Sequence, residues 1–225
     1  MQGALTKAFN ENDSWTDGLA RIYYVLAQDY LYANPSKNLI FLDNHDLSRF
    51  YTFVNEDFEK WKMGMAALLT LRGIPMIYYG TELLMTGHEH EGHGHIREDF
   101  PGGWPNDERN AFTKEGRTEQ ENKAFDYMRK ILRWRNKSNV IHTGKMTHFV
   151  PDNNTYVYFR NTDDACVMVA FNNSKSELKA LDTKRFRECM KGYTYALNIL
   201  TNETVHYLDA ITLPPKSVLI LELKK

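Results

Sequence analysis

Hydrophobic residues follow two different periods along the chain. Up to about residue 143, helical spacings of three and four residues alternate with short runs that are apolar at every position. From about residue 144 onward, apolar and polar residues alternate, and turn-forming residues separate the runs. The pattern predicts an α/β part over 1–143, followed by an antiparallel β-sandwich over 144–225.

Two solidly apolar runs in the first part flank a predicted helix. Leu39–Leu42 and Ile74–Tyr79 have the character of strands buried on both faces, as in a parallel sheet covered by helices. The helix between them has a cap at Asn55–Asp57 and one apolar face. Strand, helix and strand over 39–79 have the length of one β-α-β unit. Its helical face consists of Phe58, Trp61, Met65, Leu68 and Leu69.

Two further helices are predicted on either side of this unit. One covers residues 19–30 and ends before Asn34-Pro35. The other begins at Thr118, where Thr118 and Glu121 have the spacing of a capping box. The glycine-rich stretch 86–116 is too long for an ordinary connection, which favours a functional loop.

The second part contains six predicted strands. Turn-forming residues such as Pro151–Asn154 and Pro214-Pro215 separate them. This spacing is typical of a small antiparallel sandwich. The predicted strands cover 146–150, 155–160, 166–171, 193–198, 204–207 and 217–223.

Composition and charge narrow the function classes. Lys and Arg number 28 against 29 Asp and Glu, for a net charge of −1, and no basic block occurs, which argues against a nucleic-acid partner. No segment approaches the roughly 18 apolar residues of a membrane span, so no membrane partner is predicted. Cys166 and Cys189 are too few for a disulfide framework, and we expect buried free thiols.

A cluster of polar residues follows the first apolar run. Asp43–Asp46 come directly after it, and catalytic groups of (β/α)₈ barrels project from the carboxyl ends of the strands. Strand ends also carry polar groups with purely structural roles, and spacing alone does not separate the two interpretations.

These residues resemble a known family. Phe41–Asp46 resembles the F-x-x-N-H-D motif on the seventh barrel strand of the α-amylase family of glycoside hydrolases, and Gly73–Glu82 resembles the eighth strand. Phe100–Trp104, preceded by Arg97, is similar to neopullulanase- and cyclomaltodextrinase-like members. The resemblance implies a partial (β/α)₈ barrel, with the last two β/α units and the helix before them, and then the sandwich.

The resemblance also implies roles for four residues. Asp46 matches the carboxylate that stabilises the transition state, and His45 matches a histidine that binds the same sugar. Arg97 and Trp104 are predicted to bind substrate, although the usual D-x-x-x-R spacing is absent and leaves the register of Arg97 open. The structural alternatives are a capped strand end for Asp46, a rim histidine for His45 and a rim-sealing side chain for Trp104.

The loop also holds a histidine-rich run with glutamates between the histidines. Such a set can capture a divalent metal, but a flexible loop with glycines does not impose a tetrahedral geometry. We therefore predict no physiological metal and no cofactor, and we expect any metal binding to be adventitious, with a physiological metal site as the alternative. The four histidines are His88, His90, His93 and His95.

The nucleophile and the acid/base expected of a retaining glycosidase are missing. The family's G-x-R-x-D and D-x-x-x-N-H motifs do not occur in the chain, and a complete barrel takes about 250 residues. We therefore expect a C-terminal piece that is inactive alone and is completed by a missing N-terminal barrel segment. Its open strand edge at 39–44 is expected to be apolar and to permit dimerisation.

The predicted substrate is an α-glucan or maltooligosaccharide. The alternative is a non-catalytic carbohydrate-binding or interaction module that uses Trp104, Tyr156 and Tyr158. The resemblance is compatible with a bacterial periplasmic or cytoplasmic parent and does not decide between them.

Overall fold

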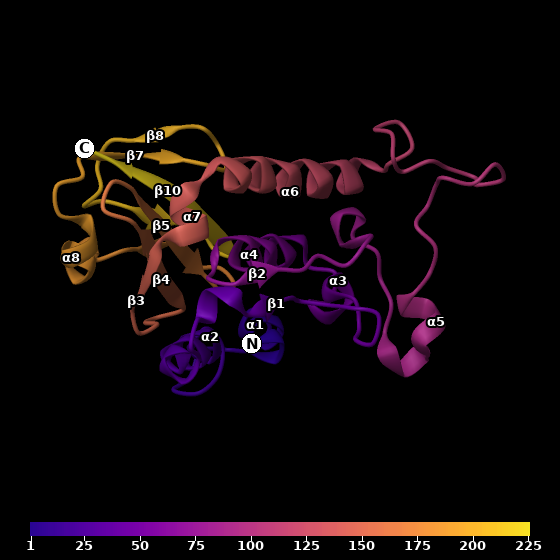
Figure 1. Cartoon of the computed structure of the whole chain (residues 1–225), viewed down its shortest axis with the longest axis horizontal. Helices are drawn as coiled ribbons and strands as arrows, with labels where there is room; N and C mark the ends of the chain where they lie inside the picture. Colours follow the sequence, from indigo (N-terminus) through magenta and orange to yellow (C-terminus); the bar gives the residue numbers. More distant parts are fainter.

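The first part of the chain builds one β-α-β unit with helices on two sides. The computed structural model describes all 225 residues. Strand β1 (Leu39–Ile40) pairs in parallel with β2 (Ile74–Pro75), and α4 (Phe58–Thr70) connects them. Helices α1 (Gln2–Ala8) and α2 (Ala20–Ala27) lie on one side of α4, and α6 (Glu119–Lys137) lies on the other (Figure 1).

Short helical turns complete this α/β part. They occupy the connections between the longer elements and include the segments that surround the end of β1. In chain order they are η1 (Asp29–Leu31), η2 (Pro35–Lys37), α3 (Phe50–Phe53), η3 (Thr81–Leu83), η4 (Glu89–Glu91), α5 (His93–Ile96) and α7 (Asn139–Thr143).

Two helix starts follow the predicted capping chemistry. The Asp57 carboxylate accepts hydrogen bonds from the backbone N–H groups of Glu59 (3.1 Å) and Lys60 (3.2 Å) at the start of α4. At the start of α6, Thr118 and Glu121 form both halves of a capping box. Because these bonds satisfy amides that the helix leaves free, both helices begin where the sequence predicted.

The second part is an antiparallel six-stranded sheet in the order β3-β4-β5-β10-β7-β8, with a separate two-stranded sheet of β6 and β9. A short helical segment, η5 (Thr183–Phe186) and α8 (Arg187–Met190), lies between β6 and β7. The predicted antiparallel architecture is confirmed. The strands are β3 (Lys145–His148), β4 (Thr155–Asn161), β5 (Cys166–Asn172), β6 (Lys179–Ala180), β7 (Tyr195–Asn198), β8 (Thr204–Val205), β9 (Thr212–Leu213) and β10 (Ser217–Lys224).

The alternating pattern of the central strands separates two hydrophobic cores. In β4, Tyr156 and Tyr158 join the core shared with the α/β part, whereas Val157 and Phe159 join the core under β6 and β9. Strand β5 divides in the same way, with Val169 on one side and Met168 on the other. Both faces of the sheet are therefore buried.

Both cysteines are free thiols, and Cys166 is buried as the sequence predicted, but Cys189 is only partly buried. Burial raises the pKa of the Cys166 thiol to about 12, so it is protonated and unreactive at neutral pH. No helix combines the length and the hydrophobicity that crossing a membrane requires.

The prediction that the first two strands are buried on both faces is wrong. Ile40 and Leu42 are 1% exposed, but Leu39 and Ile74 are 55% and 53% exposed. The register places Leu39 directly opposite Ile74, so the two apolar side chains form one exposed patch. Both strands are also only two residues long, and neither pairs with a third strand.

This exposed pair predicts self-association. We expect the chain to form a concentration-dependent dimer, because an unpaired strand edge with exposed apolar side chains favours pairing with another chain. The double substitution Leu39→Lys and Ile74→Lys should shift the chain to monomer in light-scattering measurements at tens of micromolar protein. Val150→Lys and Leu178→Lys together are the control, because these residues are equally exposed but lie in turns of the sandwich. A parent chain that is monomeric throughout the concentration range would contradict the prediction.

Polar side chains join the α/β part to the sheet. Arg160 is 1% exposed and donates hydrogen bonds to the carbonyls of Thr70 (3.1 Å), Ile141 (2.9 Å) and Gly144 (3.0 Å). Arg135 donates to Leu69 O (2.7 Å), so two arginines cap the carboxyl end of α4.

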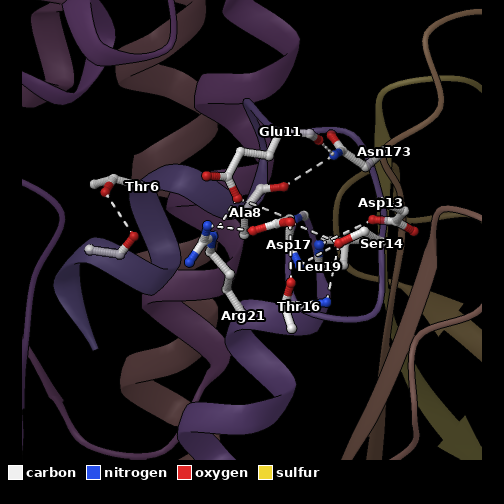
Figure 2. A network of polar contacts seen from close by, with 12 residues as sticks. Thr6, Ala8, Glu11, Asp13, Ser14, Thr16, Asp17, Leu19, Arg21 and Asn173 are labelled. Atoms are coloured by element: carbon white, nitrogen blue, oxygen red, sulfur yellow. Dashed lines mark hydrogen bonds and ion pairs between the residues drawn. The ribbon is translucent and has the colours of Figure 1, made fainter.

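The loop between α1 and α2 forms a second junction with the sheet. Figure 2 shows its network, in which Arg21 contacts the carboxylates of Glu11 and Asp17. The side-chain amide of Asn173 donates to Ala8 O (3.1 Å), and the Asp13 carboxylate accepts from Leu19 N (3.1 Å). The loop is therefore held against the turn that follows β5.

Candidate active site

The end of β1 is tied to the end of β2 by a buried carboxylate. Asp43 is 3% exposed and accepts hydrogen bonds from Phe50 N (2.8 Å) and from the Thr81 hydroxyl (3.2 Å). Burial raises the pKa of Asp43, while its hydrogen bonds and the nearby Arg49 oppose the rise. Asp43 thereby links the start of α3 and the segment after β2, so the backbone from which Asn44–Asp46 extend is held in place.

Asp46 lies in the open, between an arginine and a histidine. Its side chain is 55% exposed. Arg97 Nη2 donates to Asp46 Oδ1 (2.8 Å), and His45 Nε2 lies 3.2 Å from Asp46 Oδ2. Arg97 Nε also donates to the His45 carbonyl (2.8 Å), so one guanidinium spans both residues. The structure thus brings together three of the four predicted site residues.

The histidine-rich segment is docked beside this group by reciprocal hydrogen bonds. Ser48 N donates to Glu89 Oε2 (3.0 Å), and Glu89 N donates to the Ser48 hydroxyl (3.1 Å). The donors of Ser48 hold the pKa of Glu89 below its usual value. Arg49 N also donates to Gly87 O (2.9 Å). These contacts bring α5, and with it Arg97, to the end of β1.

The four histidines do not gather around a common point. His88 stacks on His90 with ring centroids 4.7 Å apart, and His95 lies 3.7 Å from Glu98. His93 Nδ1 is 3.1 Å from Arg97 Nη2 and 3.9 Å from Asp46 Oδ1. Nowhere in the chain do three or more His, Cys, Asp or Glu side chains converge in a way that could hold a metal ion.

Trp104 is the predicted site residue that the structure does not join to the others. Its side chain is 71% exposed, and its backbone N–H donates to Asp107 Oδ2 (2.8 Å). The segment between α5 and α6 extends away from the rest of the molecule (Figure 1). No hydrogen bond or ring contact links Trp104 to Asp46, His45 or Arg97.

Sequence reasoning missed Arg49, which holds the surroundings of the site together. Arg49 is fully buried, donates to Tyr79 O, and lies over the rings of Tyr78 (4.1 Å) and Tyr79 (4.8 Å). The Tyr79 hydroxyl in turn donates to Glu98 O (2.7 Å), next to Arg97. The only sequence signal was an arginine three residues after Asp46, which no periodic pattern distinguishes from a surface residue.

In the turn that follows β1, the carboxylate of Asp46 is accessible and lies between the guanidinium of Arg97 and the imidazole of His45. A carboxylate in this position can accept hydrogen bonds from sugar hydroxyls, and the imidazole and guanidinium can donate them. One carboxylate cannot perform the double displacement of a retaining glycosidase, which needs a second carboxyl group about 5–5.5 Å away.

Comparison with known proteins identifies the class. The protein-family model of the α-amylase catalytic domain matches residues 7–181 of the sequence. The family model of the cyclomaltodextrinase C-terminal domain matches residues 146–222. The chain therefore belongs to the α-amylase family. The two matched ranges overlap over 146–181, and the domain boundary predicted between residues 143 and 144 stays a prediction.

Individual relatives agree with this family. A cyclomaltodextrin glucanotransferase from Niallia circulans is 30% identical over 176 residues, which cover 78% of this chain and 22% of the relative. One from Geobacillus stearothermophilus is 31% identical over 169 residues, with coverage of 74% and 20%. An α-amylase from Niallia circulans is 28% identical over 168 residues, with coverage of 75% and 28%. The chain thus spans between a fifth and about a quarter of the length of these relatives.

Solved structures show the same fold. The α-amylase from Geobacillus thermoleovorans, solved with acarbose, superposes with a TM-score of 0.72 at 23% identity, covering 100% of this chain and 46% of that one. An Anoxybacillus α-amylase gives a TM-score of 0.73 at 22% identity, with coverage of 99% and 45%. The predicted combination of a partial barrel and a C-terminal antiparallel domain is therefore confirmed.

Proposed function

We propose that this chain is part of a retaining glycosidase that hydrolyses α-glucosidic bonds of starch-derived glucans, with Asp46 as its transition-state-stabilising carboxylate. The observation that carries the proposal is the exposed Asp46 in the turn that follows β1, held between His45 and Arg97. Family membership supports it, because Asp46 occupies the last position of the motif that resembles the seventh barrel strand.

In the proposed mechanism Asp46 accepts hydrogen bonds from hydroxyls of the sugar at the cleaved bond. These bonds strengthen as the ring flattens toward an oxocarbenium-like state, and they contribute several kcal/mol in glycosidases generally. His45 donates to the same sugar, whereas Arg97 binds the neighbouring one. Arg97 already contacts Asp46 Oδ1, so an incoming hydroxyl shares that oxygen or displaces the guanidinium.

The nucleophile and the acid/base are proposed to come from a preceding barrel segment that is not in this chain. Two observations support this: the motifs that carry these groups do not occur in the 225 residues, and the relatives are several times longer. The exposed Leu39 and Ile74 fit the same proposal, because they lie where further strands would cover them.

A turnover measurement tests the absence of the two carboxylates. Incubated with maltoheptaose or pullulan, the chain by itself should release no reducing ends above the protein-free blank, because covalent catalysis requires both groups. The α-amylase from Geobacillus thermoleovorans, assayed in parallel, serves as the positive control. Turnover that follows the purified chain through successive columns and disappears in Asp46→Asn would show that it carries its own nucleophile.

Calorimetric titration with maltoheptaose tests the binding roles. We expect weak, millimolar binding that falls at least fivefold in Asp46→Ala and in His45→Ala, because each substitution removes a hydrogen bond to a charged or strongly polar group worth about 1–3 kcal/mol. Asp163→Ala, an exposed aspartate in a turn of the sheet, is the control and should bind as the parent does. Equal binding by Asp46→Ala and the parent would contradict the proposed site.

The alternative of a carbohydrate-binding module loses most of its basis in the structure. Tyr156 and Tyr158 are 1% and 0% exposed, so neither ring can stack on a sugar, and their predicted role is wrong. They alternate toward the face of β4 that packs on the α/β part. Trp104 remains, and binding of maltoheptaose that depends on Trp104 but on neither Asp46 nor His45 would favour this alternative.

A further inference from the structure

A polar cleft lies at the junction of the α/β part and the sandwich, away from Asp46. It has a volume of about 230 Å³, and its walls come from the end of α1, the first turn of α4 and the turns that follow β5 and precede β10. Glu11 and Asn173, which Figure 2 shows within the network of the α1–α2 loop, belong to the wall of the cleft. Only one of the lining residues, Phe9, is apolar.

Three lysines from both parts of the molecule line this cleft. Lys60 belongs to α4, and Lys175 and Lys216 belong to the turns of the sandwich. Only Lys216 is neutralised, by Asp57 at 2.6 Å. Lys60 Nζ donates to the neutral amide oxygen of Asn10 (3.0 Å), and Lys175 has no ion-pair or hydrogen-bond partner. Two positive charges therefore remain uncompensated.

The two acidic residues of the cleft wall form ion pairs with cationic side chains that do not line the cleft. Glu11 pairs with Arg21, and Glu177 pairs with Lys179. Mutual repulsion is evident at Lys60, whose pKa is lowered by burial and further by the charges of Lys216 and Lys175, while Asp57 opposes the effect. A bound anion would relieve this repulsion.

Several neutral donors in the cleft are also free. The side chains of Asn12, Asn154 and Ser176 line it and make no hydrogen bond within the protein. Two lining residues hold left-handed backbone conformations, Asn154 with φ of 60° and Lys216 with φ of 46°. A left-handed backbone is unfavourable for lysine. Residues with such strained backbones cluster at binding and active sites.

We propose that this cleft binds a phosphate group, either inorganic phosphate or the phosphate of a small sugar ester. Two unpaired ammonium groups match a doubly charged anion, and amide and hydroxyl donors can reach its remaining oxygens. Because Lys60 comes from the α/β part and Lys175 from the sandwich, the bound phosphate bridges the two parts and stabilises their junction. The proposal is independent of the glycosidase function and of Asp46.

Calorimetric titration at pH 7.5 and constant ionic strength tests the site. Inorganic phosphate should bind the parent saturably with one site per chain. The double variant Lys60→Gln and Lys175→Gln should bind at least tenfold more weakly, because it removes both uncompensated charges. The control is Lys37→Gln with Lys145→Gln, which changes the net charge equally at exposed lysines without partners, and its affinity should stay within twofold of the parent.

Two further titrations, with glucose 6-phosphate and with glucose, identify the source of the phosphate. Tighter binding of glucose 6-phosphate than of inorganic phosphate assigns a sugar ester, and the reverse order assigns the free ion; glucose alone should not bind. Circular dichroism of the double variant verifies that it is folded. If neither phosphate binds the parent saturably, or if the control variant loses affinity as much as the double variant does, the proposal is wrong.

Discussion

Arg160→Met is expected to lower the free energy of unfolding by about 3 kcal/mol, measured by urea denaturation. The arginine is buried and donates to carbonyls of α4, α7 and the connection to β3, and hydrogen bonds from a charged donor are worth about 1.5–3 kcal/mol each. Methionine fills similar volume but leaves these carbonyls without partners. The gain from removing a buried charge offsets part of the loss, since burial lowers the pKa of Arg160 to about 10.

Arg187→Met provides the matched control. Arg187 is exposed on α8 and its side chain makes no hydrogen bond or ion pair, so its replacement should change the free energy of unfolding by less than about 0.5 kcal/mol. If Arg160→Met were as stable as this control, the hydrogen bonds at the junction would contribute nothing net. Two separate urea transitions for Arg160→Met, where the parent shows one, would show that the two parts unfold separately.

Asp46→Asn is expected to reduce turnover by about a hundredfold to a thousandfold once the missing groups are supplied. The system we envisage is co-expression of this chain with the portion of the Geobacillus thermoleovorans α-amylase that it does not cover in the superposition. Loss of about 3–4 kcal/mol of transition-state stabilisation corresponds to this factor, because each 1.36 kcal/mol is tenfold in rate. The measurement is kcat for maltoheptaose, at equal amounts of the purified complex.

The distribution of the loss between kcat and KM distinguishes Asp46 from Arg97. In the proposed mechanism the bonds of Asp46 to the sugar tighten in the transition state, so Asp46→Asn should act mainly on kcat. Arg97 is proposed to bind substrate, so Arg97→Gln should act mainly on KM. Asp163→Asn in the sheet is the control and should leave both constants unchanged. A reconstituted complex in which Asp46→Asn retains the parent kcat would exclude the proposed role.

Local patterns predicted the elements well where one residue period governs a whole segment. The strands β4, β5 and β10 form at their predicted positions, although both faces of β4 and β5 are buried, and α4 and α6 begin at their predicted caps. The two-residue strands β6 and β9 were missed, because a pairing this short leaves no periodic signal. The extent of β1 and β2 was overestimated, because an apolar run reports hydrophobicity and not whether a neighbouring strand is present to pair with it.

The sequence by itself determined that the chain combines a piece of an α/β barrel with an antiparallel domain, and that Asp46 lies in the segment that follows a strand. Sequence motifs and hydrophobic periods involve residues close together along the chain, so they can be recognised in a single sequence. Only the tertiary structure decided that Arg97 contacts Asp46 across 51 residues, that Tyr156 and Tyr158 are buried, and that lysines from both parts line one cleft. These contacts depend on how distant segments pack against one another, and no spacing along the chain encodes that packing.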